Sequence, residues 1–259
     1  MPWSTIKMKI KVIQSGSKGN CTLVICDNTK LLIDLGISYK QLLEALQELN
    51  VDINEITGLL VTHNHKDQIK GIDTFIKNTN IKVFIPKELY PSLKEEIKSL
   101  KEDNCIFIDE IDKIGPVETE LIHTSHDAPF SVGYNITYKN KELCYVTDTG
   151  YINRKYLNKM KNKDIYIIES NHDEKMLMDG PYPRFLKERV ISDRGHLSNK
   201  TTSLYLKKII GAKTKYIVLA HLSEKNNTPD IALSTIKDNI NDKDIIIASQ
   251  SKGTEVIEV

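Results

Sequence analysis

The sequence predicts an α/β protein in which two β-sheets lie against each other and helices cover the outside. Short apolar segments of strand type alternate with amphipathic helical segments in both halves of the chain, which is typical of layered α/β folds. The 259 residues show no repeat, no low-complexity tract and no linker-like change of composition, so we expect one domain over residues 1–259. Periodicity alone does not separate this arrangement from a doubly wound sheet.

The predicted elements of the N-terminal half follow from short apolar segments that end at turn residues. Leucines at helical spacing predict an amphipathic helix over 39–50 with Ser38 as its N-cap, and further helices are expected at 69–78 and from Pro86 toward Leu100. Strands are expected at 8–13, 23–25, 31–33, 59–61 and 81–85.

The C-terminal half begins with a strand-rich region and then alternates strands with helices. Strands are expected at 105–108, 118–123, 132–138, 142–146, 165–168, 216–219 and 245–248. Helices are expected at 153–160, 184–191, 201–210 and 231–240.

Composition narrows the classes of protein that fit. Lys and Arg number 36 against 35 Asp and Glu, so the net charge of +1 argues against a wholly basic nucleic-acid binder but allows a local basic patch. No apolar run approaches the ~18 residues of a membrane span, and residues 1–4 lead into a strand without the apolar core of a signal peptide. The four scattered cysteines form no Cys-x-x-Cys motif and are expected as reduced thiols, so we expect a cytoplasmic protein.

The strand at 59–61 ends in His63, His65 and Asp67, and this is the most informative stretch of the chain. Imidazole is the commonest protein ligand for zinc, and two histidines two residues apart project to the same side of an extended backbone. The alternative is a polar loop that carries two histidines by chance. The recurrence of further ligand types later in the chain favours a metal site.

Four later residues supply the partners that such a site needs. His126, Asp148 and His221 each follow an apolar strand, and His196 lies in the loop at 194–199. Loops at the carboxyl ends of strands in layered α/β folds collect into sites, so these side chains are expected to meet.

This ordered set of motifs resembles the metallo-β-lactamase fold over nearly the full chain, and its WalJ/YycJ-like subgroup in particular, which is similar to tRNase Z and to exonucleases of that fold. The resemblance implies an αββα four-layer sandwich. Its motifs are the Gly-rich opening 15–20, Leu-Ile-Asp-Leu-Gly at 32–36, the histidine motif, Ser-His-Asp at 125–127, Thr-Asp-Thr-Gly at 147–150, Ala-His-Leu at 220–222 and the subgroup-like segments 169–173 and 192–199.

The resemblance also implies a site built around one or two divalent ions. His63, His65 and His126 would bind the first ion, expected to be zinc. Asp67 and His221 would bind the second ion, and Asp148 would bridge both ions. A metal-bound hydroxide would attack a phosphoryl group clamped by the ions.

The remaining implied roles belong to residues around the ions. Asp67 would orient the water, and His196 would protonate the leaving oxygen. Asp34 would support the histidine loop from behind, Asp193 is a candidate carboxylate for orienting His196, and His172 could supply a hydrogen bond near the site or replace a lost ligand.

One position departs from the family pattern, because Gln68 stands where the family's His-x-His-x-Asp-His motif has its last histidine. A glutamine carbonyl is a harder and weaker ligand than imidazole for zinc. As an altered ligand, Gln68 would bind the second ion loosely or favour manganese or magnesium there. A single-metal enzyme and an inactive descendant also remain open at this point.

A basic stretch flanks His196. Residues 184–208 carry seven positive and two negative side chains. Such a stretch is either a solvated helix face or a track for a phosphate backbone. The residues predicted to contact a substrate backbone are Arg184, Lys187, Arg189, Arg194 and Lys200.

The sequence therefore predicts a metal-dependent hydrolase, and more specifically a phosphodiesterase or nuclease that acts on DNA as an exonuclease. Two alternatives remain. One is a hydrolase of a small ester, lactone or thioester. The other is a non-catalytic metal- or nucleic-acid-binding protein with a degraded second site at Gln68. Oligomeric state, cleavage polarity and the choice between DNA and RNA are left open.

Overall fold

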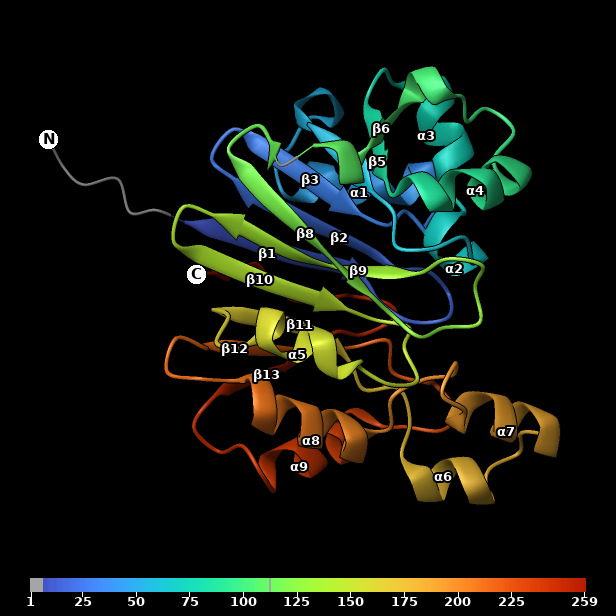
Figure 1. The fold of residues 1–259 in the computed structure, drawn as a ribbon, viewed down its shortest axis with the longest axis vertical. Coiled ribbons are helices and arrows are strands. Elements are labelled where there is room, and N and C mark those ends of the chain that lie inside the picture. Colours follow the sequence, from blue (N-terminus) through green and yellow to red (C-terminus); the bar gives the residue numbers. More distant parts are fainter. Residues whose placement is uncertain (1–6, 112) are drawn as a thin grey trace, which may run out of the picture.

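The computed structural model describes residues 7–111 and 113–259, and it contains two seven-stranded sheets. The first four residues, which we interpreted as lacking a signal peptide, lie outside the described part. Figure 1 shows the two sheets lying against each other, with helices on their outer faces.

The first sheet is antiparallel at one edge and parallel at the other. Strands β14, β1, β2 and β3 pair antiparallel, and β3, β4, β5 and β6 pair parallel. In sheet order its strands are β14 (Ile257–Glu258), β1 (Met8–Gln14), β2 (Cys21–Cys26), β3 (Thr29–Ile33), β4 (Gly58–Leu60), β5 (Lys82–Ile85) and β6 (Cys105–Phe107).

The second sheet repeats this division. Strands β10 to β13 pair parallel, and β7 to β10 pair antiparallel. In sheet order its strands are β13 (Asp244–Ile247), β12 (Tyr216–Ala220), β11 (Ile165–Glu169), β10 (Lys141–Val146), β9 (Val132–Tyr138), β8 (Val117–His123) and β7 (Lys113–Ile114).

Three buried apolar clusters hold the layers together. One cluster lies between the sheets and takes side chains from both, including Ile10, Tyr134 and Ile167. A second joins the first sheet to its helices, and a third joins the second sheet to its own. The result is the four-layer αββα sandwich that the sequence predicts.

The helices divide between the two outer faces, as Figure 1 shows, with α6 and α7 beyond the end of the second sheet. The helices on the first sheet are α1 (Tyr39–Glu48), α2 (Lys66–Ile69), α3 (Ile72–Asn78) and α4 (Tyr90–Glu96). Those on the second sheet are α5 (Arg154–Met160), α8 (Asn199–Ile209) and α9 (Pro229–Lys237), and the remaining pair is α6 (Glu174–Asp179) and α7 (Arg184–Ile191).

Some predicted boundaries were wrong. The helix expected at 69–78 is two helices separated at Gly71, where a Cβ atom would lie 2.3 Å from the carbonyl oxygen of Ile37. The helix expected to reach Leu100 ends at Glu96, because Ile97 has an extended backbone. Helix α6 and the two-residue strands β7 and β14 were not predicted, since short segments carry little periodic signal.

The topology brings the carboxyl ends of several strands to one end of the sandwich. Within each sheet the parallel strands point the same way, so the residues that follow β3 and β4, and those that follow β10, β11 and β12, meet at shared edges. Within the described residues, no helix has both the length and the apolar character needed to cross a bilayer.

Candidate metal centre

The side chains predicted for the site follow strands that end at this edge. Asp34 comes directly after β3, and His63 follows β4 by three residues. On the second sheet, Asp148 follows β10 by two residues and His221 comes directly after β12. His126 lies in the loop after β8, so residues far apart in the sequence arrive at one place.

Three of these strand-end residues have a left-handed backbone. Asp34, Asp148 and His221 have φ values of 58°, 53° and 54°. Each such non-glycine conformation costs about 1–3 kcal/mol and persists where the surroundings fix it. The amide of Asp34 donates to Leu60 O at 2.8 Å, and the amide of His221 donates to Ser15 Oγ at 2.8 Å. The folded scaffold therefore pins these strained turns beside the site.

The imidazoles of His63, His65 and His126 form what we call the histidine triangle. Their ring centroids are 4.7, 5.0 and 4.9 Å apart, and one nitrogen from each lies within 4.8 Å of the others. The Nε2 atom of His63 is buried and has no hydrogen-bond partner in the described structure. Three converging imidazole nitrogens, one of them buried and unpaired, are a donor set that fits a divalent cation.

A chain of hydrogen bonds orients His63. Its Nδ1 lies 3.0 Å from Thr62 Oγ1, which is also 2.9 Å from Asp34 Oδ2. The backbone amide of Thr62 donates to Asp34 Oδ1 at 2.8 Å. Burial raises the pKa of Asp34 well above its usual value, although the amide and hydroxyl of Thr62 lower it. The Thr62 hydroxyl donates to Asp34, so its oxygen can accept the Nδ1 proton of His63. This leaves the Nε2 lone pair of His63 facing the centre of the triangle.

His126 has an outer partner as well, because its Nδ1 atom lies 3.3 Å from Gly195 O. Asp127 Oδ1 lies 3.7 Å from Nε2 of His65 and 3.4 Å from Nε2 of His126 and hydrogen bonds to neither. The inner atoms, His126 Nε2 and His65 Nδ1, are 3.2 Å apart. Outer acceptors of this kind fix the ring orientation of metal-binding histidines.

The protonation state of the triangle suits cation binding. Burial lowers the pKa of His63 well below its usual value, and the neighbouring histidines lower it further. Burial likewise lowers the pKa of His126. Both rings are therefore neutral near pH 7, with a lone pair available to an ion.

A second group, which we call the Glu169 cluster, lies next to the triangle. It contains Asp148, Glu169, His196 and His221, each with one ligand-type atom within 4.8 Å of the others. The rings of His126 and His196 are 5.1 Å apart between centroids, and those of His196 and His221 are 5.3 Å apart. The two groups together form one continuous polar centre.

Glu169 organises this cluster. Its side chain is fully buried, and Oε2 accepts hydrogen bonds from the amides of Thr149 at 3.0 Å and Leu197 at 3.1 Å. Its Oε1 lies 2.7 Å from His196 Nδ1 and 2.9 Å from His221 Nδ1. Burial raises the pKa of Glu169, but the charge and hydrogen bond of His196, and those of His221, outweigh this, so the net pKa is lowered. An ionised Glu169 therefore holds Nδ1–H of both rings.

Because Nδ1 of His196 is bonded to Glu169, its Nε2 points away from Glu169. Burial lowers the pKa of His196, yet the charge and hydrogen bond of Glu169 outweigh it and raise the net pKa above the usual value. The sequence suggested Asp193 for this orienting role, and the structure corrects that expectation. Asp193 is exposed, and no hydrogen bond among the described residues joins its side chain to His196. From the sequence, Glu169 was expected directly after the strand at 165–168, in the segment 169–173, and its partners were not predicted; the structure makes it the last residue of β11.

Asp67 faces the Glu169 cluster from the other sheet. Its Oδ2 lies 3.4 Å from His221 Nε2 and 3.3 Å from Asn20 Nδ2. The carbonyl oxygen of Asp67 accepts from the amide of Asn20 at 2.7 Å. A Cβ atom on Gly36 would lie 1.7 Å from that same carbonyl oxygen, so only glycine allows this close approach.

Gln68 lies between the two carboxylates, Asp67 and Asp148. The residue is fully buried, and its Nε2 donates to Asp148 Oδ2 at 3.2 Å and to Asp67 Oδ2 at 3.4 Å. Its Oε1 has no hydrogen-bond partner in the described structure. The surroundings of Asp67 and Asp148 thus contain N–H donors where a second cation would need lone pairs, and the fit for a second ion is poorer than for the first.

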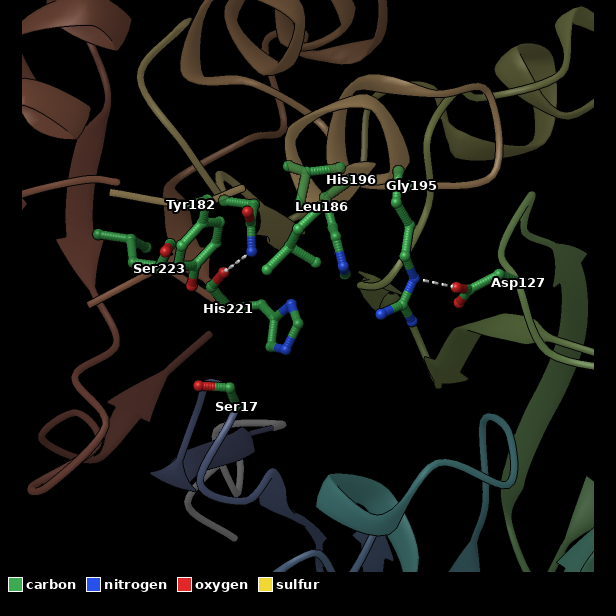
Figure 2. Close-up of a pocket in the computed structure, with 12 residues that line it drawn as sticks. Ser17, Asp127, Tyr182, Leu186, Gly195, His196, His221 and Ser223 are labelled. Carbon is green, nitrogen blue, oxygen red and sulfur yellow. Dashed lines mark hydrogen bonds and ion pairs between the residues drawn. The ribbon is translucent and has the colours of Figure 1, made fainter. Parts of the chain in front are cut away.

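A hollow of about 210 Å³ opens beside this centre, and we call it the site hollow. His196 and His221 both point into it in Figure 2, with Tyr182 and Ser223 on one side and Asp127 on the other. Ser17, from the Gly-rich opening of the chain, closes its base in that view. The site hollow is therefore lined by both sheets and by the segment that contains α7.

The predicted backbone-binding residues are dispersed by the fold. Only Arg189 lines the site hollow, where its guanidinium pairs with Asp127. Arg194 donates from Nε to His126 O at 3.1 Å, so it supports the triangle's loop. Arg184 pairs with Glu188 on the exposed side of α7, Lys187 bonds Met178 O, and Lys200 is exposed at the start of α8.

His172 belongs to neither group of ligand-type atoms. It is buried, its Nδ1 has no hydrogen-bond partner in the described structure, and it lines a second hollow of about 310 Å³ behind His196. Burial lowers the pKa of His172 to about 4, so its ring is neutral near pH 7.

Comparison with known proteins adds independent findings. The family model described as "Metallo-beta-lactamase superfamily" matches residues 15–221. The chain is 33% identical to "Exodeoxyribonuclease YycJ" of Bacillus anthracis over 91% of this chain and 90% of that protein. It is 31% identical to "Exodeoxyribonuclease WalJ" of Streptococcus pneumoniae D39, over 93% and 91%.

A solved structure agrees with the architecture. The metallo-beta-lactamase fold protein YhfI from Bacillus subtilis superposes with a TM-score of 0.74, covering 98% of this chain and 100% of that one at 18% identity. At that level of identity the likeness concerns the fold alone.

Proposed function

This chain belongs to the metallo-beta-lactamase superfamily and is a metal-dependent hydrolase, and from that premise we propose that it cleaves phosphodiester bonds in DNA as an exonuclease. The observation that carries the proposal is His196, which Glu169 holds by Nδ1 beside the histidine triangle and at the site hollow. An acid so placed suits a reaction whose leaving group is a poor one, such as the alkoxide of a sugar. The two relatives named as exodeoxyribonucleases support DNA as the substrate.

The cofactor that we propose for the histidine triangle is zinc. Neutral imidazoles are borderline-soft donors that suit Zn²⁺ better than Mg²⁺, and manganese is the nearest competitor. A divalent ion at this position supplies Lewis acidity to a phosphoryl oxygen and lowers the pKa of bound water.

The chain's own residues supply proton handling. The Nδ1 proton of His196 is held by Glu169, so the proton that His196 can donate to a leaving oxygen sits on Nε2. Glu169 remains ionised throughout and stabilises the charged ring. Asp67 is about a quarter exposed, at 23% of its side chain, and can accept a hydrogen bond from the attacking water.

The end of the DNA strand would enter through the site hollow. Arg189 offers a guanidinium for a backbone phosphate at its rim, and Tyr182 offers an aromatic face for a base. The volume of about 210 Å³ has room for a small terminal group rather than for a duplex, so we propose that DNA is approached at an end.

End-labelled DNA tests the proposal directly. The full-length protein, loaded with Zn²⁺ or Mn²⁺, should release labelled nucleotides, and His196→Ala and Asp67→Ala should lose this activity while still unfolding cooperatively on heating. Cleavage that survives both substitutions would contradict the assignment.

Salt dependence separates DNA cleavage from the hydrolysis of a small ester, lactone or thioester. Binding through backbone phosphates weakens with salt, with a log–log slope of about −0.9 per phosphate contact. Activity on small esters that is indifferent to salt, with no release from DNA, would favour the rival substrate class. Absence of both hydrolysis and bound ion would favour a binding protein.

We also propose a cytoplasmic location for the enzyme. All four cysteines are free thiols, with Cys21, Cys26 and Cys144 buried. Burial raises the pKa of Cys26 to about 12, so its thiol is unreactive near pH 7. Unpaired, inert thiols are usual where the surroundings are reducing. Fractionation of the source cells, with detection by antibody, tests this location.

A further inference from the structure

We propose that this chain holds a single divalent cation, in the histidine triangle. The Gln68 carboxamide lies between Asp67 and Asp148 and takes the place of a second cation. The inference deepens the proposed function, on which it rests for the identity of the first ion. It concerns how many ions the site holds, which is measured without any nuclease assay.

The first step is the position of Gln68. The side chain is fully buried, and the backbone is fixed on both sides, because its amide donates to His65 O at 2.9 Å and its carbonyl accepts from Leu35 N at 2.8 Å. The side chain is therefore enclosed on a fixed backbone, which leaves it little room to move away from an incoming ion.

The second step is what Gln68 does between the carboxylates. A carboxamide NH₂ group has two protons, and Nε2 lies 3.2 Å from Asp148 Oδ2 and 3.4 Å from Asp67 Oδ2. One group thus joins two carboxylates that would otherwise repel each other. Joining two carboxylates is the task that a bridging cation performs in a two-metal site.

The third step concerns the other nitrogen atoms that lie near Asp67. Asp67 Oδ2 also lies 3.3 Å from Asn20 Nδ2 and 3.4 Å from His221 Nε2. His221 Nδ1 in turn lies 2.9 Å from Glu169 Oε1. Asp67 therefore already accepts N–H groups from the side chains of Asn20 and Gln68, while Nε2 of His63 and Nε2 of His221 are both buried without a hydrogen-bond partner in the described structure.

The reverse orientation of the amide is less favourable. Turning Gln68 by 180° would direct Oε1 at the carboxylates and place the NH₂ group where Oε1 now finds no partner. Two buried N–H donors would then lack acceptors instead of one oxygen lacking a donor, and each buried unpaired group costs about 1–3 kcal/mol. Only a bound second cation would offset that cost.

The test counts ions. The purified full-length protein is stripped with a chelator, reloaded with excess Zn²⁺ or Mn²⁺, dialysed and analysed by plasma mass spectrometry. Wild type should retain one ion per chain, and Gln68→His should retain two. A matched control, Gln47→His, adds a histidine on the exposed face of α1 and should retain one.

A combined variant locates the ions. His63→Ala should hold none, while His63→Ala with Gln68→His should hold one, in the second position. Two ions in wild type would overturn the proposal, and so would a Gln68→His protein that folds, by its melting temperature, and still holds one.

Anomalous diffraction at the zinc edge decides the matter on wild type alone, even if the variants fail to fold. One peak within the histidine triangle supports the proposal, and a second peak beside Gln68 overturns it. Because neither measurement uses DNA, a failed nuclease assay with one bound ion would contradict the proposed function and leave this inference intact.

Discussion

The histidine triangle and the Glu169 cluster lie side by side, yet they satisfy their polar atoms in opposite ways. In the triangle the outer nitrogens of His63 and His126 have hydrogen-bond partners, while Nε2 of His63 is left unpaired. In the cluster the carboxylates accept N–H groups from within the protein, since Glu169 Oε1 holds both His196 and His221. Each region has one buried imidazole nitrogen without a partner, Nε2 of His63 and Nε2 of His221, but only beside the cluster does an N–H donor, from Gln68, lie between two carboxylates.

The difference teaches that ligand types alone do not define a metal site. Imidazoles gather in both regions, and carboxylates join them in the Glu169 cluster, but a cation is needed only where lone pairs converge without protons between them. Where an N–H donor lies between two acceptors, the protein has supplied the positive end itself. Substitutions in the two regions should therefore have different consequences for ion content and for turnover.

The largest effect should come from breaking the triangle. His63→Ala removes the buried, unpaired nitrogen, so we expect loss of the bound ion and of DNA cleavage, by more than the roughly 100-fold that loss of an outer partner costs. Ion content by mass spectrometry and release from end-labelled DNA measure the two losses. Retained cleavage with no bound ion would mean that the triangle is not the catalytic metal site.

The next effect should come from the Glu169 cluster and should leave the ion in place. His196→Ala should lower kcat on DNA by about 10²–10⁴, the usual contribution of a general acid, with little change in KM. A p-nitrophenyl phosphodiester has a leaving group that needs no proton, so the loss on that substrate should be much smaller. Equal losses on both substrates would assign His196 a structural role instead.

Glu169→Gln should act through His196 rather than on the substrate. The amide cannot stabilise a charged ring as a carboxylate does, so we expect a loss of about 10-fold to 100-fold on DNA and again a smaller loss on the p-nitrophenyl ester. A double variant with His196→Ala should be no worse than His196→Ala alone. Additive losses would show that Glu169 acts by another route.

A smaller effect should follow from removing a negative charge beside the triangle. Asp127→Asn removes a negative charge that lies 3.4 Å from Nε2 of His126 and 3.7 Å from Nε2 of His65, and we expect affinity for the ion to fall about 10-fold. Titration of the stripped protein with Zn²⁺ measures this change. Unchanged affinity would show that Asp127 serves Arg189 and not the triangle.

The smallest effect should lie at the rim of the site hollow. Arg189→Ala should raise KM for DNA several-fold and reduce the salt slope of binding by about 1, the signature of one lost phosphate contact. Arg154→Ala, an exposed arginine at the start of α5 that does not line the site hollow, is the matched control and should change neither quantity. If the two variants behave alike, Arg189 does not contact a DNA phosphate.

Much of this protein could be predicted from the sequence, because its signals are local. Apolar segments of period two or of continuous type mark the strands, and polar ligand types placed directly after them mark the edge where a site forms. The departure at Gln68 was visible for the same reason, as one residue within a short motif. The αββα layering and the meeting of His63, His65 and His126 followed from those patterns.

Only the tertiary structure decided which neighbours complete each side chain. That Glu169 rather than Asp193 holds His196, that Arg194 supports the His126 loop while Arg189 lines the site hollow, and that the Gln68 amide lies between two carboxylates are all contacts between distant segments. Periodicity reports which face of an element is buried. It carries no information on the angle at which a side chain from one sheet meets a side chain from the other, and hydrogen bonding depends on that angle.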